Sequence, residues 1–144
     1  MITYKAMEMH THTLHSDGTF TVPELCRSAL AHGFDGVALT DHNTLAPYEQ
    51  ITPDLERETI PIVRGIEWTT FFGHMLVLGS NRYVDWRLAT PNAIDAYLRE
   101  IHQADGVVGI AHPFALGSPF CTGCHWQYNV RDWEEIDYIE IWSE

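Results

Sequence analysis

A short segment near the start of the sequence, residues 10–18, carries three imidazoles and a carboxylate. It follows residues 3–10, whose composition is typical of a strand. Alternate residues of a strand point to the same face, so His10 and His12 could hold one metal ion together. A polar loop whose histidines cluster by chance is the alternative, and similar side chains later in the chain argue against it.

Metal-binding side chains also follow or end three further segments that are predicted to be strands. These side chains are Asp41, His42, Glu67 and His112. Functional groups of α/β proteins gather at the carboxyl ends of the strands. One histidine after a strand would mean little, but four strands that each end in such a side chain indicate a site.

His74 differs from the others because it begins its predicted strand, residues 74–78. Only a short segment separates it from Glu67. If the two strands form an antiparallel hairpin, the start of one lies beside the end of the other. We therefore expect Glu67 and His74 to meet at the same metal ion.

The types of ligand limit which metal ions could bind and which reaction they could catalyse. Imidazole with carboxylate favours Zn, Mn or Fe over Mg or Ca. A carboxylate can bridge two ions about 3.5–4 Å apart, and Glu67 is the central candidate for this role. Such a pair of ions could activate water for the hydrolysis of a phosphate ester or a related acyl bond. Ser16 lacks the G-x-S-x-G context of a serine hydrolase.

The elements that must position these groups alternate between strand and helix, which predicts an α/β architecture with mainly parallel strands. We expect strands at residues 3–10, 36–40, 60–67, 74–78, 107–111 and 136–142. We expect helices from Thr21 or Val22 to a stop at Gly33, within 45–58 with an interruption at Pro53, and at 91–104. The apolar stripe of the first helix is Leu25, Ala29, Leu30 and Phe34.

Length and composition predict one globular domain, residues 1–144, with 45% hydrophobic and 19% charged residues. The net charge is −12 and the sequence has no basic stripe, which argues against a nucleic-acid partner. No apolar run approaches the roughly 20 residues of a membrane span, and the start lacks the apolar region of a signal peptide. We therefore expect a cytoplasmic protein, and the sequence does not indicate its oligomeric state.

Cys121, Cys124 and His125 fit the C-x-x-C-H pattern of haem attachment, but that chemistry requires export. A structural zinc bound by all three needs a fourth ligand. A local disulfide is disfavoured in a reducing cytoplasm. We expect loop thiols near the mouth of the site, packed with Trp126.

Two other groups of side chains could contact a substrate. An apolar wall for an aromatic substrate could form from Trp126, Tyr128 and Trp133, although core packing is the favoured interpretation. The few cations that could clamp a phosphate are Arg64, Arg82 and Arg131.

Five segments match, in order, the motifs of one family: His10–Gly18, Leu39–Thr44, Gly65–Glu67, Gly73–His74 and Ala111–Pro113. The sequence thereby resembles the PHP (polymerase and histidinol phosphatase) superfamily of metal-dependent phosphoesterases. Three segments are similar to its CehA/McbA-type branch, in which some members cleave aryl carbamates: Gly73–Gly79, Cys121–Trp126 and Ile139–Trp142.

The resemblance implies a distorted (β/α)7 barrel with two or three divalent ions, Zn, Mn or Fe. The implied ligands are His10 and His12 for one ion, Asp17 and His42 for a second, and Glu67, His74 and His112 for a third, with Glu67 bridging to the first. Asp41 would orient a ligand without binding metal itself. His15 falls on no expected ligand position, and either faces substrate or solvent.

The family's last motif, an Asp-x-His that would complete the first two sites, is absent from this sequence. We therefore expect the barrel to be incomplete in this chain, which is either a fragment or a shortened member. Turnover should be weakened or absent if no partner supplies the missing pair.

The expected function is a metal-dependent hydrolase that uses metal-activated water on a small phosphate mono- or diester. A carbamate or ester hydrolase with the same metal site is one alternative. A degenerate, non-catalytic metal-binding module is another.

Overall fold

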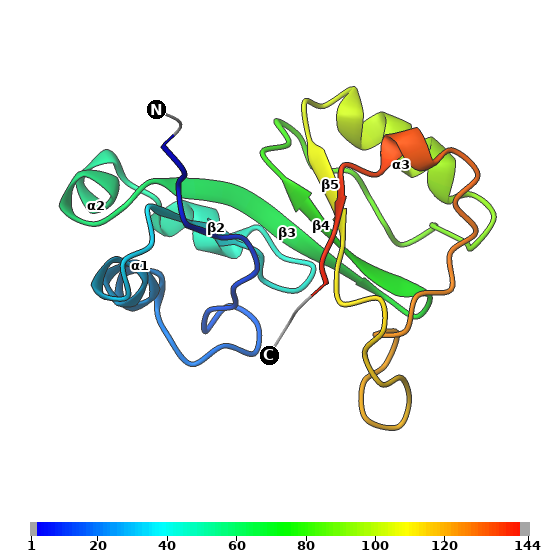
Figure 1. Cartoon of the computed structure of the whole chain (residues 1–144), viewed down its shortest axis with the longest axis horizontal. Coiled ribbons are helices and arrows are strands. Elements are labelled where there is room, and N and C mark those ends of the chain that lie inside the picture. Colours follow the sequence, from blue (N-terminus) through cyan, green and yellow to red (C-terminus); the bar gives the residue numbers. More distant parts are fainter. Residues whose placement is uncertain (1–2, 142–144) are drawn as a thin grey trace. The chain divides into compact units, whose positions relative to one another are not determined.

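The computed structural model describes residues 3–141, and the chain divides into two compact units, residues 1–66 and 67–144 (Figure 1). The first unit holds β1 (Met7–Glu8), α1 (Val22–Ala31), β2 (Gly36–Leu39), a 3-10 turn (Ala46–Gln50), α2 (Pro53–Glu58) and the start of β3 (Ile62–Thr70). The second holds the end of β3, β4 (Gly73–Leu78), α3 (Ile94–His102), β5 (Val107–Ile110), a 3-10 turn (Trp133–Glu135) and β6 (Tyr138–Ile139). No helix within residues 3–141 has the length and apolarity that crossing a membrane requires.

The strands follow the order β1-β2-β3-β4-β5-β6 in one six-stranded sheet. β1 pairs with β2 and β2 with β3 in parallel, and β5 pairs with β6 in parallel. β4 pairs antiparallel with β5, and the two-residue connection Phe71–Phe72 reverses the chain between β3 and β4. The mixed α/β class and the reversed fourth strand are therefore as the sequence predicts.

Helix α1 begins where a complete capping box forms. The backbone N–H of Thr21 donates to the carboxylate of Glu24 (2.9 Å), and the Thr21 hydroxyl accepts from the Glu24 N–H (3.4 Å). The helix buries Val22, Cys26 and Ala29. With four further buried residues they form the core of the first unit: Val37, Leu39, Leu55 and Ile60.

One residue of the predicted stripe lies elsewhere. Leu30 keeps 46% of its surface exposed, because its position next to Ala29 turns it away from the buried face of α1.

Several element boundaries differ from those predicted. Pro53 begins α2 and does not interrupt a longer helix, because a proline fits the first turn and Thr52 caps it by accepting from the Leu55 N–H (3.1 Å). Strand β3 continues beyond Glu67 to Thr70 because the hairpin extends its pairing. The helix expected at 91–104 spans only 94–102, and the strand expected at 3–10 is reduced to residues 7–8.

The second unit is built around strand β4, all six residues of which are buried. Helix α3 packs against β5 and buries Ile94, Leu98 and Ile101. On β5, a Cβ at Gly109 would overlap the ring of Tyr138, so glycine makes room for β6 to pair. The strand expected at 136–142 is described only as β6, and its predicted end at Trp142 lies outside the described residues.

The capping box predicts a measurable contribution to stability. Replacing Thr21 with alanine removes the acceptor of the Glu24 N–H, so the free energy of unfolding should fall by about 1 kcal/mol. Urea denaturation followed by circular dichroism measures this change. The exposed Thr19→Ala is the matched control and should change stability by less than about 0.5 kcal/mol. Equal effects of the two substitutions would contradict the role of the cap.

Candidate metal centre

The chain that follows β1 is fixed beside the end of β2 by Thr11 and Thr40. The Thr11 N–H donates to the Thr40 hydroxyl (2.8 Å), and the Thr40 N–H donates to the Thr11 carbonyl (3.0 Å). Thr11 and Thr13 are buried, whereas His10 and His12, which alternate with them along the chain, are only half-buried. The two histidines thus share one face, and their Nε2 atoms lie 3.1 Å apart.

Behind this segment lies the fully buried carboxylate of Asp41. Its Oδ1 accepts from the Thr13 N–H (2.8 Å) and from the Ser16 hydroxyl (2.7 Å), and the Thr13 hydroxyl lies 3.0 Å from both carboxylate oxygens. Among the described residues, Asp41 belongs to none of the groups whose ligand atoms converge. Its contacts hold the loop that carries His12 and Asp17. The role of orienting a metal ligand stays a prediction for Asp41.

The turn that closes the loop depends on Gly18. Its N–H donates to the Thr13 carbonyl at 3.0 Å, and a Cβ at this position would overlap the carbonyl group of His12. A glycine here lets the backbone return close to His12 and brings Asp17 beside it.

One candidate cluster in the first unit consists of His12, Asp17 and His42, with ligand atoms within 4.8 Å of one another. Asp17 lies 3.5 Å from Nδ1 of His12 and 3.4 Å from Nε2 of His42. The His12 and His42 rings stack with centroids 4.4 Å apart. The structure therefore groups His12 with Asp17 and His42 as well as with His10, whereas the resemblance assigns it to the ion of His10.

His15 stands apart from the cluster. It is exposed, and its Nε2 lies 2.6 Å from the side-chain amide nitrogen of Gln50. A contact with substrate stays a prediction for this residue.

A second candidate cluster lies wholly in the second unit and consists of Glu67 from β3, His74 from β4 and His112 after β5. Nδ1 of His74 lies 3.0 Å from Oε1 of Glu67, and Nε2 of His112 lies 3.1 Å from the same oxygen. The side chains of Glu67 and His74 are 0% and 3% exposed, and that of His112 is 15% exposed. The cluster is thus buried on one side and reaches solvent at His112.

The donors of this cluster fit a divalent transition metal. Ligands about 2.0–2.1 Å from a tetrahedral zinc ion lie about 3.3 Å apart, close to the separations found here. Two imidazoles and a carboxylate are also the donor types that Zn, Mn and Fe accept. Three protein ligands with one side open to solvent are typical of catalytic zinc sites.

His112 is held in an unusual backbone conformation by a neighbour that the sequence analysis missed. Its φ is +28°, and its N–H donates to Oε2 of Glu140 at 2.8 Å. Glu140 directly follows β6, as His112 closely follows β5. The rule that found the other candidates, a polar residue after a strand, could therefore have found Glu140.

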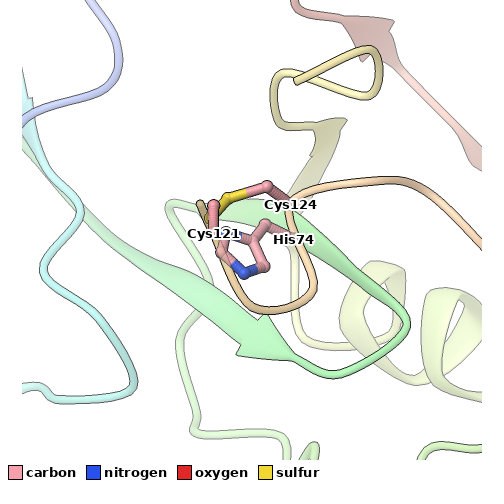
Figure 2. Close-up of side chains that lie close together, drawn as sticks. All are labelled: His74, Cys121 and Cys124. Carbon is pink, nitrogen blue, oxygen red and sulfur yellow. A yellow bond between two sulfur atoms is a disulfide. The ribbon is translucent and has the colours of Figure 1, made fainter. Parts of the chain in front are cut away.

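The expectation of free loop thiols was wrong, because a disulfide joins Cys121 and Cys124. The residues pack closely because the loop folds onto the β3–β4 hairpin, where the Gln127 N–H donates to the Phe72 carbonyl (2.6 Å). Figure 2 shows His74 beside the cysteine pair. His125, which the sequence offered as a third zinc ligand only in an alternative interpretation, is exposed, and the histidine grouped with the cysteines is His74.

The aromatic residues of this loop pack against the hairpin, in agreement with the favoured interpretation. Tyr128 is 4% exposed and its hydroxyl lies 2.9 Å from that of Thr70. A Cβ on Gly73 would meet the ring of Trp126. Trp133 differs from both, because it keeps 55% of its surface exposed.

Two of the three arginines considered as phosphate clamps, Arg64 and Arg82, have other partners. The guanidinium of Arg82 lies 3.5 Å from the carboxylate of Glu100, and that of Arg64 lies 5.5 Å from the ring centroid of Tyr48.

Three comparisons show which known proteins this chain is similar to. The family model of the PHP domain matches residues 8–138. A 5'-3' exoribonuclease of Haemophilus influenzae is 32% identical over 66 residues, which are 46% of this chain and 24% of the exoribonuclease. The chain thus matches about a quarter of that relative's length.

Solved structures share the fold at low sequence identity. A protein classed as a metal-dependent phosphoesterase from Bifidobacterium adolescentis superposes with a TM-score of 0.66 at 17% identity, over 96% of this chain and 77% of that one. A two-domain protein from Bacteroides vulgatus, described as containing a predicted PHP-like metal-dependent phosphoesterase, superposes with a TM-score of 0.60 at 21% identity. The match covers 85% of this chain and 39% of that one. Since the family model covers most of the sequence and includes every candidate ligand, the chain belongs to the PHP domain family.

Proposed function

We propose that this chain is a metal-dependent hydrolase that cleaves a small phosphate mono- or diester. The observation that supports this most directly is the convergence of two imidazole nitrogens, from His74 and His112, on one oxygen of the buried Glu67. Membership of the PHP family and the likeness to structures classed as metal-dependent phosphoesterases support the same conclusion.

The proposed ligands are the seven residues that the sequence singled out. In the second unit they are Glu67, His74 and His112, and in the first they are His10, His12, Asp17 and His42. A divalent ion bound there supplies Lewis acidity and lowers the pKa of a water molecule, so no side-chain nucleophile is required. The bridging role that the resemblance gives Glu67 stays a prediction.

The protein's own contribution is to hold its ligands in place before substrate arrives. Burial removes the hydration of the Glu67 carboxylate, so its negative charge is costly unless a cation lies beside it. His74 and His112 are held on either side of it, from β4 and from the end of β5. The partly exposed edge at His112 provides a side from which substrate can approach.

Charge favours a small substrate over a nucleic acid. The exoribonuclease from Haemophilus influenzae is named for RNA cleavage, and it matches this chain over only part of its length. Twenty acidic residues stand against eight basic ones here, so an RNA backbone would be repelled. A small ester can be held by the metal ions without an extended basic surface.

A substrate panel tests the proposed function. With Mn²⁺, Zn²⁺ or Fe²⁺ added, the chain should release nitrophenol from p-nitrophenyl phosphate or its diester faster than naphthol from a naphthyl carbamate. Faster carbamate cleavage would contradict the phosphoesterase proposal and support the alternative, a carbamate hydrolase with the same metal site. Hydrolysis that survives Glu67→Ala combined with His112→Ala would exclude metal-dependent catalysis at this cluster.

Glu67 is predicted to control metal binding directly. Glu67→Gln keeps the shape of the side chain and removes its charge, so the metal affinity of this cluster should fall by more than about 100-fold. Isothermal titration with Zn²⁺, together with the metal content of the purified chain, measures this loss. Glu134→Gln, at an exposed position, is the control and should leave both unchanged. Unchanged affinity in Glu67→Gln would contradict the assignment.

Asp41 is predicted to act through the loop that it holds. Asp41→Asn leaves one carbonyl acceptor for the Thr13 and Ser16 donors and puts an N–H₂ group in a buried position, so stability should fall by about 1–3 kcal/mol. The metal affinity of the His12, Asp17 and His42 cluster should fall by about 10–100-fold.

Titration of Asp41→Asn in the Glu67→Gln background isolates the first-unit cluster. The exposed Asp54→Asn should match wild type in both stability and affinity. Loss of stability with full metal affinity would limit Asp41 to a purely structural role.

A further inference from the structure

His74 presents its two ring nitrogens to two different groups. Nδ1 lies 3.0 Å from Glu67, and Nε2 lies 3.2 Å from the carbonyl oxygen of Thr122. Thr122 lies between Cys121 and Cys124, and the imidazole of His74 lies beside both cysteine side chains (Figure 2). One histidine therefore belongs both to the carboxylate cluster and to a sulfur-containing cluster.

We propose that Cys121, Cys124 and Nε2 of His74 form a thiolate-rich zinc site when the disulfide is reduced, and that this site competes with the Glu67 cluster for His74. The ligand atoms of the three residues lie within 4.8 Å of one another. The C-x-x-C spacing is that of structural zinc sites, and three protein ligands leave one position for water.

The loop is built to keep its cysteines at His74. Gly123 has φ +76°, and a Cβ on it would overlap the Thr70 carbonyl, so the loop lies directly on the end of β3. The buried pair of Thr70 and Tyr128 hydroxyls, 2.9 Å apart, anchors the chain after the loop. These contacts do not involve sulfur, so they persist when the disulfide opens.

Redox state decides whether the sulfur atoms can bind metal. A dithiol reductant gives two electrons and two protons to the pair: the S–S bond breaks, two S–H groups form, and the reductant becomes a disulfide. Zinc then displaces the two thiol protons as the thiolates bind. In the disulfide form the sulfur atoms are bonded to each other and provide no thiolate.

A neutral imidazole carries one N–H, which makes the two sites exclusive at His74. With a metal ion bound at the Glu67 cluster, Nδ1 of His74 would give its lone pair to that ion, and Nε2–H would donate to the Thr122 carbonyl. With zinc on the thiolates and Nε2, the proton resides on Nδ1 and donates to Glu67. The competition depends on the proposed metal binding at the Glu67 cluster, but zinc binding by the two thiolates and His74 does not depend on it.

Cobalt reports thiolate ligation directly through a near-ultraviolet charge-transfer absorption, which imidazole and carboxylate ligands do not produce. The chain is reduced with dithiothreitol, freed of it under argon, and titrated with Co²⁺. The reduced chain should develop the band and lose it when Zn²⁺ is added. The disulfide form should not develop it.

Variants assign the ligands. Cys121→Ser and Cys124→Ser should each abolish the band, and Cys26→Ala, at a cysteine in the core of the first unit, should keep it. His74→Ala should weaken Co²⁺ binding at the thiolates by about tenfold or more. A reduced wild-type chain without the band would overturn the proposal, as would a band whose Co²⁺ affinity His74→Ala leaves unchanged.

The Glu67→Gln variant separates this inference from the proposed function. It should keep the cobalt band and bind Co²⁺ at the thiolates at least as tightly as wild type, because competition for His74 is removed. If the wild-type chain binds no metal at the Glu67 cluster while its reduced form still develops the band, the hydrolase proposal falls and the zinc site stands. If the band weakens in Glu67→Gln, the competition at His74 is wrong.

Discussion

The arrangement of side chains in the second unit depends on compensating the charge of one buried carboxylate. Glu67 is completely buried on β3, and a charged group in that position is costly unless partners meet it. His74 and His112 reach the same oxygen from β4 and from the end of β5. The surroundings of β4, with every residue buried, keep water away and strengthen these contacts.

The first unit supports its histidines by a different means. Polar side chains behind the chain, Thr40 and Asp41, hold the backbone at Thr11 and Thr13 through hydrogen bonds. The side chains of His10 and His12, which are proposed to bind metal, then project from a fixed backbone. Because these hydrogen bonds fix the backbone on both sides of His12, the threonines of the motif position the proposed ligands.

Local patterns allowed much of the arrangement to be predicted. Alternation placed His10 and His12 on one face, the capping residues located the start of α1, and the short connection before His74 indicated a hairpin. These features depend on neighbours in the sequence. Metal binding at the predicted residues rests on the proposals above.

Core packing was the favoured interpretation for Trp126 and Tyr128, but the specific partners of residues 113–131 could not be predicted, because that stretch has no helical or strand period. The disulfide, and the contact of Thr122 with His74, arise only when the loop folds onto the hairpin. The extension of β3 to Thr70 likewise depends on pairing and not on the β-propensity of its own residues.

The two-residue connection between β3 and β4 limits how this family member can vary during evolution. Because side chains alternate between the two faces of a strand, inserting or deleting one residue at Phe71–Phe72 would turn His74 to the opposite face of the sheet. Many side chains could replace either phenylalanine without that effect. Natural selection should therefore preserve the number of residues in this turn more strictly than their identity, and homologues should tolerate substitutions there but not length changes.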